Sequence, residues 1–475
     1  MRFVQHFRRL SRRDARRFYE WVHSPLHCRH EDVRTIVAHL TELYPELDDA
    51  AEDRAALLRV LGRDDDAHLA VVLTYALRQL EDFHAWQTQQ QADFRRQLDR
   101  LQRLRNESDL RAARKHHQRM LRDLDRQPLR NADHFRRQYE LATEADVLAL
   151  LSGTDADQTL ARKQQLLDAY YLIEKLRNAC ETVVRRTILR LEHHDPLLAP
   201  LLHWLDLHPE WSTSVPALRV YVLMLRLLRD GRSEDYAPVR DALRTHDTLF
   251  PFEERQQLYN YLQNFCIAQI NRGHPEFHRR LFDLYRRQLA GDLLSNDNHQ
   301  FEWHYKNIVN VALRVGETDW VAAFLEDYRD LLPKQSRENA YSFNKAAYHY
   351  ARHNFDRVLE LLQHVEYNDL RYHLGARVLL LRTYYELGED EVLLALTSSF
   401  RQFLQRAISL NRERSTALKN LVRFTRRTVQ LRQQSPFLRK DKLDREREKL
   451  RQEMLAEPRT INRGWLLEKI ALVGI

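Results

Sequence analysis

A short sequence pattern recurs at intervals of about 35 residues in the second half of this 475-residue chain. Segment 319–325 (DWVAAFL) aligns with segment 354–360 (NFDRVLE), and segment 389–393 (EDEVL) has the same phase a further 35 residues along. An aromatic-rich stretch precedes each of them, at 303–315, 341–352 and 372–387. A period of this length, with a tight polar turn between two helical segments, predicts stacked pairs of helices.

The pattern resembles the tetratricopeptide repeat, although no single unit carries the full consensus. Shorter paired helices are also predicted upstream, at 217–228 with 234–246 and at 253–271 with 276–289, with Gly231 and Gly273 in the turns. We therefore predict tetratricopeptide-like helical repeats over 216–435, arranged as an α-solenoid in which each pair packs against the next.

The rest of the chain also favours helix, because only 10 glycines and 13 prolines interrupt a sequence that is rich in strong helix formers. We predict an all-α fold that begins with an N-terminal helical bundle over 1–90. Long basic and connecting helices follow over 91–215, and a charged helix with an apolar capping helix occupies 436–475.

The sequence favours a cytoplasmic protein. No window holds the run of about 20 apolar residues that a membrane span needs, so we expect no membrane insertion. The first 20 residues include seven arginines but lack the apolar core of a secretory signal. Cys28, Cys180 and Cys266 are isolated and odd in number, which suits a reducing compartment.

Motifs for catalysis, cofactors and metals are missing from the sequence. There is no phosphate-binding glycine loop, no dinucleotide fingerprint and no paired-histidine zinc helix. His23 and His27 have one-turn spacing, with Cys28 and His30 nearby, but Pro25 breaks that helix. We therefore predict a protein that is not an enzyme and binds no cofactor or metal, although an activity built from scattered residues would leave no such signature.

Positive charge is concentrated in one region. The chain has a formal net charge of +8, and residues 94–139 hold 14 Arg or Lys against 6 Asp or Glu. Some of these arginines have expected partners at helical spacing, Asp99 with Arg103 and Glu107 with Arg111. The remaining cations form either a solvated face, a site for an acidic partner or a nucleic-acid site. The candidate basic patch consists of Arg95, Arg96, Arg103, Arg114, Lys115, Arg119 and Arg122.

Five segments resemble a family of bacterial all-helical proteins of similar length, which has no established activity. They are 18–32 (FYEWVHSPLHCRHED), 258–272 (LYNYLQNFCIAQINR), 305–315 (YKNIVNVALRV), 369–386 (DLRYHLGARVLLLRTYYE) and 465–470 (WLLEKI). The chain departs from the family at 26–28, where the family has aromatic residues and an asparagine. The resemblance implies a helical, tetratricopeptide-like fold and leaves the function open.

The leading hypothesis is a non-catalytic protein-binding scaffold, whose solenoid groove holds a peptide or helix of a partner protein. The first helix of each pair is predicted to supply the groove. The alternative is a nucleic-acid-associated protein that uses the arginine-rich helices at 94–139, and a structural subunit that packs against copies of itself is a third possibility. The candidate groove residues are Tyr305, Lys306, Asn307, Asn310, Asn344, Lys345, Tyr348, Arg377, Arg382 and Tyr385.

Overall fold

The computed structural model describes residues 1–44, 54–91, 93–154, 156–189, 195–294, 298–363, 365, 370–406 and 411–474. Within these ranges every regular element is a helix and none is a strand, so the predicted all-α fold is confirmed. The chain divides into two compact units, Met1–Lys175 and Leu176–Ile475, and the predicted segment 91–215 contributes to both. No helix in the described ranges is long and apolar enough to cross a membrane.

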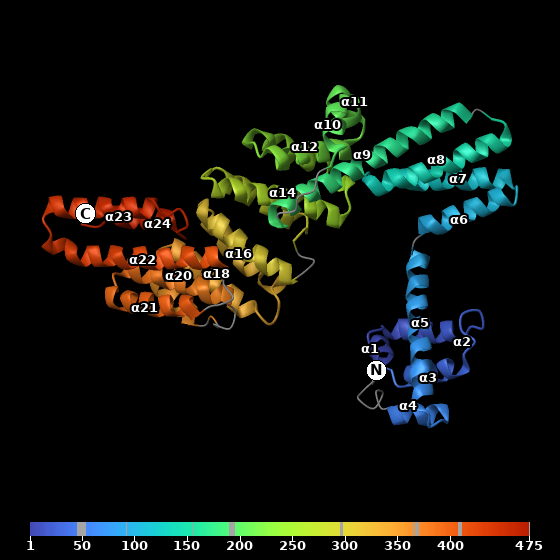
Figure 1. Cartoon of the computed structure of the whole chain (residues 1–475), viewed down its shortest axis with the longest axis horizontal. Helices are drawn as coiled ribbons and strands as arrows, with labels where there is room; N and C mark the ends of the chain where they lie inside the picture. The colour runs from blue at the N-terminus through green and yellow to red at the C-terminus, as the bar shows by residue number, and fades with distance from the viewer. Residues whose placement is uncertain are drawn as a thin grey trace. The chain divides into compact units, whose positions relative to one another are not determined.

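The first unit opens with a small bundle, in which the long α5 runs beside four shorter helices (Figure 1). Its core is aromatic, with the buried Phe18 ring 6.1 Å from Phe7 and 5.4 Å from Phe83. The Ser11 side chain caps α2 by accepting a hydrogen bond from the Asp14 backbone N–H. The helices are α1 (Arg2–Phe7), α2 (Arg12–His23), α3 (Glu31–Glu42), α4 (Arg54–Leu61) and α5 (Asp66–Gln91).

The same unit continues with the basic helices α6 (Asp93–Asn106), α7 (Leu110–Asp125) and α8 (Ala132–Ser152), followed by the start of α9 (Ala156–Leu189). α7 packs against both α6 and α8. Asp109 caps α7 through the Ala112 N–H, and the buried Asp146 of α8 accepts a hydrogen bond from Lys163 of α9 at 3.1 Å. The chain leaves helix near Ser108, between α6 and α7, and near Pro128, between α7 and α8.

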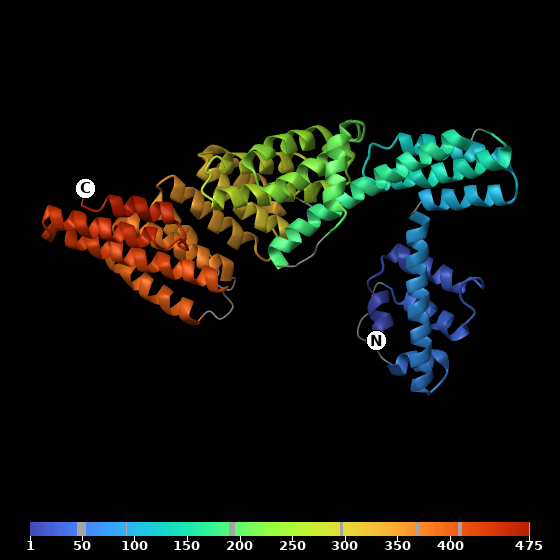
Figure 2. The same cartoon turned by 45° about the horizontal axis from the view of Figure 1, so that its top comes forward.

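The second unit consists mainly of helix pairs joined by short turns, and each pair contacts the next (Figure 2). The first helices of successive pairs also touch, α12 with α14, α16 with α18 and α18 with α20. These contacts are compatible with the predicted solenoid. The helices are α10 (Leu198–Leu207), α11 (Pro209–Ser214), α12 (Pro216–Asp230), α13 (Tyr236–His246), α14 (Phe252–Asn271), α15 (Phe277–Ala290), α16 (Asn298–Arg314), α17 (Thr318–Asp327), α18 (Arg337–Ala351), α19 (Phe355–Gln363), α20 (Leu370–Leu387), α21 (Asp390–Arg406), α22 (Arg412–Gln434), α23 (Lys440–Leu455) and α24 (Arg463–Ala471).

A left-handed residue ends the first helix of five pairs. It is a glycine in four of them and His353 in the fifth, with φ near +57°. In the three pairs of the 35-residue pattern the next residue turns its N–H back to the last turn of the helix, as Glu389 N–H does to the Tyr384 carbonyl at 3.0 Å. The five residues are Gly231, Gly273, Gly316, His353 and Gly388.

We expect Gly388→Ala to lower the stability of the protein by about 1 kcal/mol, because an L-residue is strained at positive φ. A Cβ atom at Gly388 would meet no atom within 4 Å, so the change in stability reports backbone strain alone and no steric clash. Gly464→Ala is the matched control, because its Cβ also meets nothing and its φ is not positive. His353→Gly should stabilise the protein. Urea unfolding of the three variants checks this, and equal effects of the two alanine substitutions would contradict it.

The C-terminal helix α24 packs against the preceding helices, with Leu466 and Ile470 buried among residues of α20 to α23. This packing is compatible with the predicted capping role. The half-buried Glu386 carboxylate of α20 holds α24 in place. This carboxylate accepts hydrogen bonds from Trp465 Nε1 and Lys469 Nζ, both at 2.9 Å. The Glu386 carboxylate therefore ties the mostly apolar helix α24 to α20.

We expect Glu386→Gln to destabilise the protein at neutral pH by about 2 kcal/mol, the usual contribution of a hydrogen bond to a charged group. Burial acts to raise the pKa of Glu386, but the hydrogen bonds from Trp465, Lys469 and Tyr350 and the positive charge of Lys469 together outweigh it, and the pKa is lowered from 4.5. The carboxylate thus stabilises the fold above pH 4.5, and this contribution is lost as pH falls through the lowered pKa.

Unfolding of the wild type and of Glu386→Gln at several pH values measures this effect. The stability difference should be constant near pH 7 and shrink in acid. A difference that persists unchanged at pH 3 would show that the carboxylate charge is not what holds α24.

Candidate functional site

Three of the ten candidate groove residues lie inside the helix array. Tyr305 is fully buried and its hydroxyl donates to the Leu325 carbonyl at 2.9 Å. Asn344 is 1% exposed and donates to the carbonyl oxygen one turn back. Tyr385 packs edge-on against Trp465, with ring centroids 5.4 Å apart. Tyr305 and Tyr385 hold neighbouring helices together, and Asn344 bonds within its own helix. None of the three offers a surface to a partner, which corrects their predicted role in the groove.

Two candidate lysines contact neighbouring helices. Lys306 of α16 places its ammonium 4.8 Å from the ring centroid of Phe343 on α18. Lys345 of α18 forms an ion pair with Glu326 of α17 at 3.1 Å. Both remain partly accessible to solvent. Both lysine charges therefore interact with side chains of neighbouring helices.

The remaining α18 and α20 candidates also have internal contacts. Tyr348 accepts a hydrogen bond from Arg352 at 2.9 Å. The Arg382 guanidinium lies 4.3 Å from the Tyr350 ring centroid and 5.5 Å from that of Trp465. Arg382 therefore contributes to the attachment of α24.

Asn307 and Asn310 lie on the outer part of α16, where Asn307 is half-buried and Asn310 exposed. Arg377, on α20, lines a recess of the surface. The ten residues thus do not form one continuous groove. The solvent-facing site that includes one of them lies between α20 and α21.

This recess has a volume of about 340 Å³ and lies between two antiparallel helices. Arg377 Nε donates to His373 Nε2 at 2.6 Å, and its NH1 lies 3.4 Å from Ser399 Oγ across the recess. Leu380 and Leu396 form the half-buried apolar walls. The result is a mixed surface with a cationic end and an apolar middle.

The apolar wall continues beyond the recess along both helices. Tyr384 and Leu387 follow Leu380 on α20, and Val392 precedes Leu396 on α21, with Leu387 38% and Val392 44% exposed. Sequence reasoning missed the α21 side. The signal was present, because positions 392, 396, 399 and 403 share one face of a helix.

The basic helices show which predicted cations are neutralised. Arg95 pairs with Asp99 at 3.1 Å and Arg103 with Glu107 at 2.8 Å. Arg96 likewise pairs with Asp93 at 3.2 Å. The expected pairs Asp99–Arg103 and Glu107–Arg111 are therefore wrong, because each acid binds the arginine one turn before it.

The remaining cations of the predicted patch lie on α7. Arg114, Lys115, Arg119 and Arg122 are exposed, as is Arg111. Of these five cations only Arg119 has an ion-pair partner among the described residues, the exposed Asp123 at 3.8 Å. We call these five residues the α7 cationic face.

The neighbouring histidines of α7 point inward. His116 donates to the Gln97 carbonyl of α6 at 3.1 Å, and His117 donates to the Leu141 carbonyl of α8 at 3.0 Å. Burial lowers the pKa of His117, although the Leu141 hydrogen bond opposes this. His117 is therefore neutral at physiological pH and adds no charge to the α7 cationic face.

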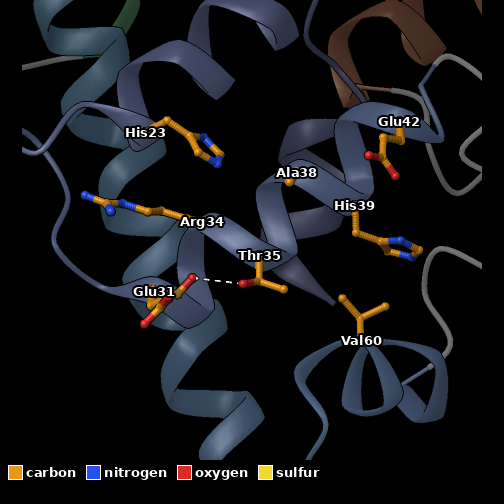
Figure 3. A pocket seen from close by; sticks show the side chains of 8 residues that line it. All are labelled: His23, Glu31, Arg34, Thr35, Ala38, His39, Glu42 and Val60. Atoms are coloured by element: carbon orange, nitrogen blue, oxygen red, sulfur yellow. Dashed lines mark hydrogen bonds between the residues drawn. The ribbon is translucent and has the colours of Figure 1, made fainter.

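A polar recess of about 500 Å³ lies along α3 in the N-terminal bundle (Figure 3). Figure 3 shows His23 and His39 on opposite sides of it. Arg34 donates to the carbonyls of Val22 and Cys28, so it closes the α2–α3 loop. In the described part of the chain no three His, Cys, Asp or Glu side chains gather in a way that could hold a metal ion.

The cysteines are unsuited to nucleophilic catalysis. All three are buried as free thiols. Burial raises the pKa of Cys180, and it raises that of Cys266 to about 12. The thiols of Cys180 and Cys266 therefore stay protonated, and all three cysteines are shielded from solvent, whereas a reactive cysteine needs an accessible thiolate.

No family model, curated protein or solved structure matches this chain. The resemblance to a family of bacterial helical proteins therefore stays a prediction. Any function has to be argued from the two surfaces described above, the α20–α21 recess and the α7 cationic face.

Proposed function

We propose that the protein is a non-catalytic scaffold that holds a helical segment of a partner protein in the recess between α20 and α21. The observation that carries this proposal is the apolar strip that the two helices leave open to solvent. A monomeric helical array normally buries such a strip under its next helix, so an open one marks an interaction surface.

The chemistry of the recess suits an amphipathic helix. Two antiparallel helices form a groove into which a third helix can pack side chains spaced at i, i+3 and i+4. Leu380 and Leu396 would contact the apolar stripe of that helix. A carboxylate near Arg377 would add a charge-assisted hydrogen bond, which favours an acidic, amphipathic segment.

Substitution of Ser399 tests the recess directly. Ser399→Arg puts a long charged side chain into the recess from an exposed position of α21. We expect it to reduce partner capture at least tenfold, because one misplaced bulky side chain costs more than about 1.4 kcal/mol of binding. The measurement is affinity capture of the tagged full-length protein from its source lysate, with quantitative mass spectrometry.

Ser398→Arg is the matched control. Ser398 is also exposed but is not among the residues that line the recess. A protein captured by the wild type and by Ser398→Arg but lost with Ser399→Arg would be the expected partner. Partners retained equally by both variants would contradict the assignment.

A further inference from the structure

We infer that the α7 cationic face binds the phosphate backbone of a nucleic-acid duplex, independently of the α20–α21 recess. The face consists of Arg111, Arg114, Lys115, Arg119 and Arg122, with no acidic residue between Asp109 and Asp123. In this part of the basic region, most of the exposed cations form no ion pair with a described carboxylate.

The face is continuous because of helix geometry. At 100° per residue, the five cations fall within an arc of about 140° on one side of α7. Ala113, Met120 and Leu124 lie on the opposite side and are buried against α6 and α8. The packing of the apolar side therefore fixes all five cations toward solvent.

The cations of α6 and those of α7 differ in whether a carboxylate neutralises them. Arg95, Arg96 and Arg103 of α6 each have a carboxylate within 3.2 Å. On α7 the single pair, Arg119 with Asp123, is longer at 3.8 Å and highly exposed. No carboxylate in the described ranges pairs with Arg111 or Lys115. The effective positive charge of the region is therefore concentrated on α7.

The density of this charge matches that of a duplex strand. Residues 111 to 122 span about 16 Å of helix, which gives roughly one cation every 4 Å. One strand of duplex nucleic acid carries a phosphate about every 3.4 Å along its axis. The face thus has a charge spacing close to that of the strand, and its five cations can neutralise at most about five phosphates.

The composition of the face selects the duplex over other polyanions. It carries no aromatic residue on which unpaired bases could stack, and such platforms are the usual feature of single-strand sites. Ala113, Met120 and Leu124 of α7 are already buried, and Leu121, at 36% exposed, is the large apolar side chain that this helix leaves at the surface. A single such side chain is little apolar surface to enter a membrane interface. Backbone contacts alone predict binding without sequence preference.

The test is the salt dependence of binding by the full-length protein, measured by fluorescence anisotropy with labelled DNA and RNA duplexes of about 20 base pairs. Five neutralised phosphates give a slope of log K against log salt near −4.5. This corresponds to about a 500-fold loss of affinity between 50 and 200 mM salt. Binding of either duplex with such a slope supports the inference, and the two probes identify the preferred duplex.

The triple variant Arg111→Gln, Lys115→Gln and Arg122→Gln should reduce the slope to about −1.8, because two cations remain. The control variant removes the same charge from α6, as Arg95→Gln, Arg96→Gln and Arg103→Gln, and should keep the wild-type slope. Equal effects of the two variants would show general charge attraction and overturn the assignment to α7.

Three further outcomes would overturn the inference. One is the absence of duplex binding by the wild type at 50 mM salt, and another is tighter binding of the single strand of the same length. The third is that poly-glutamate or vesicles rich in phosphatidylserine displace the duplex at equal charge concentration. That result would mean that α7 recognises an acidic protein or an anionic lipid surface.

Discussion

The left-handed turn at the end of a first helix is the constraint on which the second unit depends. A helix end exposes carbonyl groups that need partners, and the turn satisfies them with N–H groups of the residues that reverse the chain. At Gly388 this turn brings α21 back along α20 and thereby forms both walls of the recess. Because backbone bonds make the turn, the side chains of the two helices are free to vary between pairs.

Helix boundaries could be predicted from the sequence far better than the site. The segments of the 35-residue pattern start at 319, 354 and 389, and the corresponding second helices begin at Thr318, Phe355 and Asp390. Spacing identifies a helix, but each helix of an array has one face toward its partner, one toward the next pair and one toward solvent. Sequence spacing cannot distinguish the face toward the next pair from the face toward solvent. For that reason Tyr305 and Tyr385 were placed in a groove although both are buried.

The choice between ion pairs was equally open in the sequence. Asp99 has an arginine one turn before it and another one turn after it, at the same spacing. The general preference places the acid first, which favours Arg103. The structure uses Arg95 instead, and Glu107 likewise uses Arg103. Because of this one-turn shift, Arg95 and Arg103 of α6 are neutralised, and Arg111 of α7 lacks its predicted partner. The net positive charge of the region therefore lies mainly on α7.

The α7 cationic face lowers the intrinsic stability of its helix, because like charges at i and i+4, such as Arg111 with Lys115, destabilise a helix by about 0.2–0.5 kcal/mol per pair. Contacts on the other side offset this repulsion. Asp109 caps the first turn, and His116 and His117 bond to the backbones of α6 and α8. A helix anchored in this way can keep its cations unpaired. A bound polyanion would remove the repulsion and therefore stabilise the folded state.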